Sequence, residues 1–432
     1  MPRRTFVAGH SRRWRAVSAC PGRRALAALF VGLALVMVAC GGSRTGAAPT
    51  PTARPATSPT ATPQPSCVRW RIVAIPDGTR YLDSRLLAVS AVSPTDAWAV
   101  GINFTEGGTV GPLTSLIERW DGAAWHLLSS PGSGSLNGVA AISANDAWAV
   151  GSALSTQQTS LRETLVEHWN GATWSLVASP DPGATNNILN GVAALASNDA
   201  WAVGAYNTTD ALVPLIEHWD GTAWHVVQSA VPQGVQSELF AVARIPGANQ
   251  LWAVGSTLKL PRPSFEQPLI ERWNGTAWQI VAGPTLPSGA LGGQLKGVAA
   301  LSAMDAWAVG EYTASNHTRQ PLMAHWNGSA WASMAGSLPS GAEAGFLSGV
   351  AAAGSRDVRA VGGSFTGGAG MSQAMIAQWD GAAWRVIESP APSGASYRAL
   401  NAVTTDGAGN YWAVGSYSAV AGREQTLAVH CP

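Results

Sequence analysis

The chain has 432 residues, of which 12% are charged, and its formal net charge is +1 at pH 7. Lysine and arginine therefore form no strong positive patch, which excludes the electrostatic signature of a protein that binds nucleic acid.

The N-terminal segment, residues 1–39, has the composition of an export signal. Seven arginines lie between Arg3 and Arg24, and the apolar run Ala25–Ala39 follows them. This run is shorter than the roughly 20 residues that a membrane-spanning helix needs, and its length is typical of the apolar part of a signal peptide. It ends in V-M-V-A-C-G (residues 36–41), which resembles a bacterial lipoprotein signal, with Met37 where leucine is usual. The resemblance implies lipidation of Cys40 and anchoring to the outer surface of a membrane; the alternative is an uncleaved membrane anchor.

Residues 40–66 are dominated by Gly, Ala, Pro, Thr and Ser, with six prolines between Pro49 and Pro65. This composition cannot bury a core, so it predicts an extended, disordered tether. Residues 67–432 remain as the folded domain. Export agrees with the use of cysteine, because after signal cleavage only Cys40 and the pair Cys67 and Cys431 remain.

A repeat with a period of about 50 residues runs through the folded domain, which indicates a propeller, a solenoid or an array. Each unit contains D-A-W-A-V-G or a variant of it, then a tryptophan before an Asn/Asp-Gly pair, and then a second tryptophan five residues later. The three classes are Trp98, Trp148, Trp201, Trp252, Trp307 and Trp412; Trp120, Trp169, Trp219, Trp273, Trp326 and Trp379; and Trp70, Trp125, Trp174, Trp224, Trp278, Trp331 and Trp384.

The second unit shows most clearly that one repeat contains four short strands. The Asn170-Gly171 pair is a strong hairpin signal, because both positions of such a turn favour residues that tolerate positive φ. Apolar alternation and β-branched residues surround it, with no helical period. Four strands repeated seven times predict an all-β, seven-bladed propeller with four antiparallel strands per blade. The strands expected in this unit are Leu136–Ile142, Ala147–Gly151, Thr164–Trp169 and Thr173–Val177.

The last unit stops before its fourth strand. The segment Cys67–Val73 aligns in frame with the fourth strand Gly275–Val281, so we expect it to complete the last blade and close the ring. Cys431 takes the place of the tryptophan before the missing hairpin, and Cys67 takes the place of the hairpin glycine. These positions predict a Cys67–Cys431 disulfide; the alternative is two free thiols.

The order D-A-W-A-V-G, variable loop, L-I-E-[HR]-W-N-G-T-A-W resembles a kelch-type blade over about 85% of the chain. Kelch blades carry a glycine pair after the second strand, whereas most units here have one glycine and Gly362-Gly363 is a pair. The chain thus resembles an exported bacterial kelch-like propeller lipoprotein. The resemblance implies the fold and leaves the ligand open.

Two loops in each unit vary in sequence, one after the second strand and one after the fourth. Up-and-down blades place both sets on one face, and variable loops on a rigid scaffold are where binding usually occurs. Residues that begin the innermost strands should surround the channel mouth on that face, and several tyrosines lie in or beside the loops. The candidate binding residues are Asn137, Asn190, Phe240, Lys296, Ser348 and Asn401 at the mouth, and Tyr81, Tyr206, Tyr312 and Tyr397 near the loops.

Other recurring polar residues are expected to be structural. Histidines at one strand position are spread around the ring, too far apart to bind one metal ion. In-frame glutamates are expected to bond the backbone or an indole of a neighbouring blade, and aspartates before the second strand to accept a turn N–H. We expect no metal and no cofactor. These residues are His168, His218, His325 and His430; Glu118, Glu167, Glu217 and Glu271; and Asp96, Asp146, Asp199, Asp305 and Asp357.

Three functions remain open. The first is a monomeric binding or scaffold propeller that presents its loops to a protein or glycan partner. The second is a polysaccharide-active enzyme, a hydrolase or lyase, which would need two carboxylates within about 10 Å of each other. The third is a passive structural role. The carboxylates available in the loops are Glu106, Asp210, Glu238, Glu266 and Glu343.

Overall fold

The computed structural model describes residue 67 and residues 69–76, 83–104, 113–155, 161–232, 235–258, 265–334, 336–367, 371–419 and 423–432. The chain divides into two units, Met1–Ala61 and Thr62–Pro432, and the described residues belong to the second. The predicted signal peptide, the predicted tether and Cys40 lie outside them. In the described ranges, no helix has the length and apolar character needed to span a membrane.

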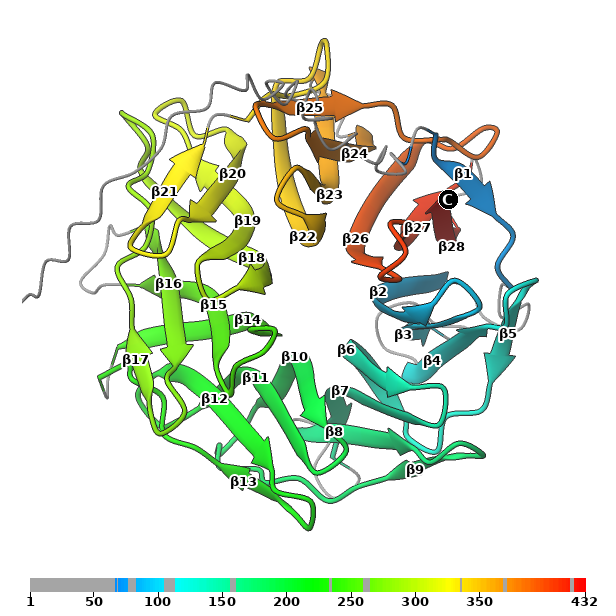
Figure 1. The fold of residues 1–432 in the computed structure, drawn as a ribbon, viewed down its shortest axis with the longest axis vertical. Coiled ribbons are helices and arrows are strands. Elements are labelled where there is room, and N and C mark those ends of the chain that lie inside the picture. The colour runs from blue at the N-terminus through cyan, green and yellow to red at the C-terminus, as the bar shows by residue number, and fades with distance from the viewer. Residues whose placement is uncertain are drawn as a thin grey trace, which may run out of the picture. The chain divides into compact units, whose positions relative to one another are not determined.

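The strands form seven four-stranded antiparallel sheets arranged in a ring (Figure 1), which confirms the predicted seven-bladed propeller. Blade 1 contains β2 (Asp83–Ser93), β3 (Asp96–Phe104), β4 (Leu113–Trp120) and β5 (Trp125–Leu128), and blade 2 contains β6 (Gly134–Ser143), β7 (Asp146–Leu154), β8 (Arg162–Trp169) and β9 (Trp174–Leu176). Blade 3 contains β10 (Asn187–Ala196), β11 (Asp199–Asn207), β12 (Leu212–Trp219) and β13 (Trp224–Val226), and blade 4 contains β14 (Gln236–Arg244), β15 (Leu251–Leu258), β16 (Glu266–Trp273) and β17 (Trp278–Ile280). Blade 5 contains β18 (Gly292–Ser302), β19 (Asp305–Thr313), β20 (Arg319–Trp326) and β21 (Trp331–Met334), and blade 6 contains β22 (Ala344–Gly354), β23 (Asp357–Thr366), β24 (Met371–Trp379) and β25 (Trp384–Ile387).

Blade 7 joins the two ends of the folded domain. It contains β26 (Tyr397–Thr405), β27 (Tyr411–Ser418), β28 (Glu424–Cys431) and, as its outer strand, β1 (Arg71–Val73). Strand β1 pairs with β28 from Arg71 opposite His430 to Val73 opposite Ala428, so the predicted closure is confirmed, although the paired part is shorter than Cys67–Val73. In Figure 1, β1 in blue lies beside β28 in red. The predicted Cys67–Cys431 disulfide is present, with Cα atoms 5.4 Å apart.

In blades 1 to 6, the third and fourth strands meet in a four-residue hairpin. In blade 2, Trp169 pairs with Trp174, and the Asn170 Oδ1 accepts hydrogen bonds from the amides of Ala172 and Thr173, both at 3.0 Å. Gly171 has a φ of 95°, whereas Asn170 does not have a positive φ. The hairpin prediction is therefore correct, but its reason was wrong for the first position: the asparagine caps the turn through its side chain.

Three tryptophans pack together at each of six of the seven junctions between blades. Trp98 of blade 1, for example, packs against Trp169 and Trp174 of blade 2, with ring centroids 5.1 and 5.0 Å apart. At the junction of blades 6 and 7, Arg359 takes the place of the first tryptophan. Its guanidinium is buried, pairs with Asp357 and lies 4.9 Å from the centre of the Tyr411 ring.

Three of the four recurring histidines pair with an aspartate, whereas the ring of His430 stacks on Trp412 and its Nε2 has no hydrogen-bond partner among the described residues. His168 Nε2 and Asp146 Oδ1 share a hydrogen bond of 2.9 Å, and the His168 ring lies 4.3 Å from that of Trp148. The same arrangement holds in blades 3 and 5, and in blade 1 Arg119 replaces the histidine against Asp96. Four of the aspartates thus pair with a side chain of the third strand, and Asp357 pairs with Arg359 of its own strand, which differs from the turn N–H that we expected. No group of three or more possible metal ligands occurs in the described part of the chain.

Three buried glutamates attach the connections between blades. The Ser229 hydroxyl donates to Glu271 Oε1 at 2.7 Å, and the Ala230 amide donates to Oε2 at 2.8 Å. Equivalent bonds join Ser130 to Glu167 at 2.6 Å and Ser179 to Glu217 at 2.5 Å. Each glutamate therefore bonds the connection that arrives from the preceding blade. The backbone partner that we expected is found at Glu271, whereas Glu167 and Glu217 accept hydrogen bonds from serine hydroxyls.

Candidate functional site

The two ends of the propeller differ in what they present. The innermost strand of every blade runs from the end that carries the connections after the second and fourth strands, which we call the loop face, to the end that carries the short turns, which we call the turn face. Both variable loop sets are thus on one face, as predicted.

A β-bulge recurs in the innermost strand of all seven blades. In β10 the pairing with β11 shifts between Leu189 and Gly191, which leaves Asn190 as the extra residue. Glycine in the neighbouring strand makes room for this bulge, because a Cβ at Gly204 would lie 1.9 Å from the Ile188 carbonyl oxygen. A bulge redirects a side chain. The glycine at the end of D-A-W-A-V-G is therefore needed for the bulge beside the channel.

The bulge residues of all seven blades line one cavity of about 180 Å³ near the loop face. The six residues predicted to surround the channel mouth are all among them, so this grouping is as expected. Leu87 completes the ring and was missed, although its place between Leu86 and Ala88 matches that of Asn137 between Leu136 and Gly138. The seven residues are Leu87, Asn137, Asn190, Phe240, Lys296, Ser348 and Asn401.

The three asparagines of this ring join neighbouring blades. Each donates its side-chain amide to the carbonyl oxygen just before the next bulge: Asn137 to Leu189 at 2.9 Å, Asn190 to Leu239 at 2.9 Å, and Asn401 to Leu86 at 2.7 Å. The last bond connects blade 7 to blade 1. These amide groups serve the ring itself, which leaves the other side chains of the mouth for a ligand.

Lys296 is the one cation of the bulge ring, and it lies over Phe240. Its Nζ is 3.4 Å from the centre of the Phe240 ring, a cation–π contact. Burial lowers the pKa of Lys296, while Glu238, Glu311 and Glu266 act in the opposite direction. Burial also raises the pKa of Glu238, which accepts a hydrogen bond from Asn190 at 2.9 Å and feels the negative charge of Glu266.

Sequence reasoning missed Glu311 as a member of this charged group. Its carboxylate accepts a 2.6 Å hydrogen bond from Gln294 and pairs with Arg319 at 3.5 Å. Glu266 and Glu311 both line a cavity of about 280 Å³ between blades 4 and 5, with Phe265 on its wall. A signal was available, because the other blades have Ile, Ser, Ala or Gly at the position of Glu311.

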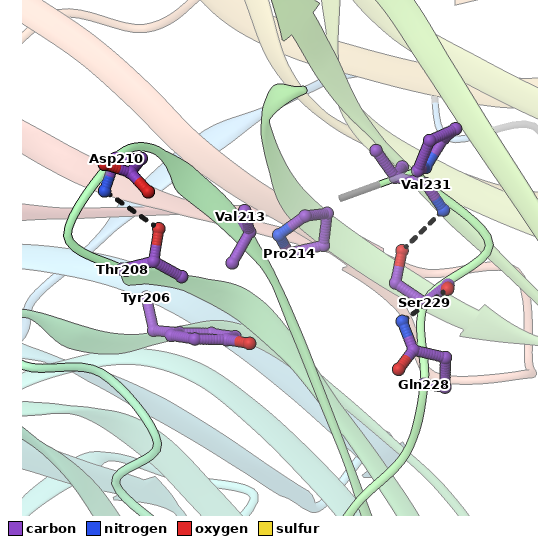
Figure 2. Close-up of a pocket in the computed structure, with 9 residues that line it drawn as sticks. Tyr206, Thr208, Asp210, Val213, Pro214, Gln228, Ser229 and Val231 are labelled. Carbon is purple, nitrogen blue, oxygen red and sulfur yellow. Dashed lines mark hydrogen bonds between the residues drawn. The ribbon is translucent and has the colours of Figure 1, made fainter. Parts of the chain in front are cut away.

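A separate cavity of about 300 Å³ lies on the loop face beside Tyr206. Figure 2 shows Tyr206, Thr208 and Asp210 on one side, the segment from Gln228 onward on the other side, and Val213 and Pro214 between them. Two predicted residues, Tyr206 and Asp210, thus come together here. They come from the connection between β11 and β12, while Gln228–Pro232 follows β13.

The other predicted residues do not join either group. Tyr312 packs against the apolar cluster between blades 4 and 5. Tyr397 lies at the start of β26, where burial raises its hydroxyl pKa and the charges of Glu424 and Arg85 act on it. Glu343 is exposed at the loop face. Tyr81 and Glu106 lie outside the described residues.

Comparisons with known proteins find similarity only among solved structures, at low sequence identity. No family model matches the chain, and no curated protein matches its sequence. Among solved structures, YCF48 bound to D1 peptide has a TM-score of 0.49 at 17% identity, covering 84% of this chain and 97% of that chain.

Two carbohydrate-active enzymes are also similar in fold. A GH74 xyloglucanase from Xanthomonas campestris has a TM-score of 0.49 at 14% identity, covering 83% of this chain and 55% of that chain. A PL25 ulvan lyase bound to -[GlcA(1-4)Rha3S]- has a TM-score of 0.48 at 9% identity, covering 82% and 95%. The chain therefore spans about half the length of the xyloglucanase, and at these identities the similarity concerns the fold alone.

Proposed function

We propose that this protein is an exported, kelch-like propeller lipoprotein, anchored to a membrane through Cys40, whose loop face binds a protein or glycan partner. The observation that supports this most directly is the contrast between the two ends of the ring. Near the loop face the seven bulge residues, which are of five different types, line one cavity, and two further cavities lie between the loops.

The turn face presents smaller side chains to the channel. The cavity at that end of the channel, of about 360 Å³, is lined mainly by small side chains such as Ala141, Ala194, Ala300 and Ala352. A specific binding site needs a few placed polar groups among apolar ones. The loop face has this combination and is therefore the face that we expect to bind the partner.

A capture experiment with matched variants tests the binding function. The purified chain is used as bait on the envelope and culture supernatant of its own organism. The partner should be lost when the Ala205–Val213 loop is shortened and kept in Met304→Lys, since Met304 is an exposed residue of a turn-face turn. Equal capture by both variants, with both shown to be folded, would contradict a loop-face site.

Anchoring is tested separately from binding. Cells that express the chain are fed a labelled fatty acid, and label should enter the wild-type protein but not Cys40→Ala. Fractionation should then find the wild type with membranes and the variant in the soluble fraction. Label in both proteins would reject Cys40 as the acylated residue.

A second candidate function is supported by the charged group at the channel mouth. Glu238 and Glu266 are close enough for the charge of one to raise the pKa of the other, and Lys296 lies beside them. A buried carboxyl with a raised pKa, as at Glu238, is a candidate for acid–base catalysis. If the protein is a polysaccharide hydrolase or lyase, Glu238→Gln should abolish the release of reducing ends or unsaturated products, while the exposed control Glu343→Gln should not.

A further inference from the structure

We propose that the Tyr206 cavity is a subsite for one uncharged sugar ring. This inference rests on the proposed binding function and names the chemistry of one site on the loop face. The cavity has about 300 Å³, at the lower end of the roughly 300–1,000 Å³ of small-molecule sites. Its size therefore suits one ring rather than a folded segment.

Both walls of the cavity are fixed without a ligand. On one side, the Thr208 hydroxyl accepts hydrogen bonds from the amides of Asp210 and Ala211, at 3.3 and 3.0 Å. On the other side, the fully buried Glu271 accepts hydrogen bonds from the Ser229 hydroxyl and the Ala230 amide. A site whose walls are already ordered loses little conformational entropy on binding, which favours weakly bound small ligands.

The cavity has an apolar wall and polar groups that are free to bond a ligand. Tyr206 packs on the apolar cluster between blades 2 and 3 and also lines the cavity, near the buried Pro214. Figure 2 shows its ring between the two loops. Within the described part of the chain, no hydrogen bond is made by the Asp210 carboxylate, the Tyr206 hydroxyl or the Gln228 side-chain oxygen.

This combination matches the two kinds of surface on a sugar ring. The C–H groups of a pyranose pack on an aromatic face, while its neighbouring hydroxyls donate to a carboxylate and an amide oxygen. No lysine, arginine or histidine is among the residues that line the cavity, so an acidic sugar would find no opposite charge. The ligand class is therefore a neutral hexopyranose, free or at the end of a glycan.

Two other ligand classes fit less well. Cages for quaternary ammonium ions surround the cation with several aromatic rings, and one aromatic residue lines this cavity. Proline-rich peptides dock in grooves walled by aromatic side chains, a feature that a single ring does not provide. Both classes enter the test as outcomes that would overturn the proposal.

The test is saturation-transfer NMR of the purified full chain with the methyl glycosides of glucose, galactose, mannose and N-acetylglucosamine. At least one should receive saturation from the protein, with a Kd of about 1 mM. Tyr206→Ala should weaken that binding about tenfold or more, and Asp210→Asn about fivefold. The matched control is Tyr417→Ala, because Tyr417 has the same place in β27 and packs on the cluster of blades 6 and 7.

Three results would overturn the sugar subsite: no transfer to any glycoside, transfer that survives in Tyr206→Ala, or binding of tetramethylammonium or a proline-rich peptide in place of the glycosides. If the glycosides fail while the Ala205–Val213 loop is still needed to capture a partner, the sugar class is wrong and the binding function stands. If both fail, the loop face is not the working surface.

Discussion

A serine and a glutamate change together at five of the seven connections between blades, whereas the other two have Ile75 with Glu118 and Ser389 with Val429. The serine lies five residues after the tryptophan that begins the fourth strand, and the glutamate lies in the third strand of the next blade. Where the serine becomes glycine the glutamate becomes alanine, because a buried carboxyl left without its partner costs more than the removal of both groups. The pairs are Ser130 and Glu167, Ser179 and Glu217, Ser229 and Glu271, Gly283 and Ala324, and Gly336 and Ala377.

The buried glutamates give the protein a pH-dependent stability. Burial raises the pKa of Glu217 to about 8, and the negative charge of Asp181 adds to this. In the unfolded chain the same carboxyl titrates near its ordinary value of 4.5. Its stabilising effect is thus complete below about pH 4.5 and is lost as the pH rises to about 8, since the unfolded state then binds fewer protons than the folded state.

We therefore predict that Glu217→Gln flattens the pH profile of stability. The amide stays neutral at every pH, so the variant should equal or fall slightly below the wild type at pH 5 and exceed it at pH 9. One pKa unit corresponds to about 1.4 kcal/mol. The free energy of unfolding of the wild type should therefore fall by several times this amount between pH 5 and pH 9. Urea unfolding at pH 5, 7 and 9 measures this.

Glu343→Gln is the control for the change from carboxyl to amide, because Glu343 is exposed. It should leave the wild-type profile unchanged. A Glu217→Gln profile as steep as that of the wild type would show that the buried carboxyl does not control the pH dependence.

At the scale of strands, the bulge of the innermost strand depends on the D-A-W-A-V-G glycine opposite it. The tight approach is similar in other blades: a Cβ at Gly255 would lie 1.9 Å from the Glu238 carbonyl oxygen, and one at Gly362 would lie 2.0 Å from that of Phe346. Both close atoms belong to the backbone and cannot rotate away. The repeated glycine is thus a steric requirement of the innermost pair of strands.

Gly255→Ala should consequently destabilise the protein strongly, by about 3 kcal/mol or more, as overpacking in a close-packed interior does. Gly283→Ala is the matched control, since the nearest atoms to its Cβ would be 3.5 Å away, an ordinary contact. The control should unfold at nearly the wild-type urea concentration. Comparable losses in both variants would mean that the close carbonyl at Gly255 is not the cause.

The repeating parts of these strands could be predicted because each unit supplies the same signal several times. The hairpin between Trp169 and Trp174 and the position of the bulge residues both follow from the frame. The bulge itself could not be predicted, since it depends on a backbone contact between two strands. The Tyr206 cavity was hidden for the same reason: Tyr206 lies in β11 and Gln228 follows β13, and only the folded blade brings them to one cavity.

At the scale of the whole molecule, the closing blade differs from the others in how it is joined. The junction of blades 6 and 7 has the buried Arg359 in place of a tryptophan. On the loop face, Glu424 of β28 pairs with Arg85 of β2 at 2.5 Å, and its amide donates to Asp83 at 2.6 Å. Arg85 is about half exposed, so this pair is screened by solvent and adds little. The Cys67–Cys431 disulfide is thus the covalent bond that closes the ring.

Replacing both cysteines, Cys67→Ser with Cys431→Ser, should therefore lower the free energy of unfolding by up to about 5 kcal/mol, because the bridge closes a loop of 364 residues in the unfolded chain. Since β1 has only three paired residues, its amides should also exchange with solvent faster than those of β26. Urea unfolding and hydrogen exchange of the wild type, with and without reductant, make the comparison. The reduced wild type should match the double variant, whereas a variant as stable as the oxidised wild type would show that the strand pairing alone closes the ring.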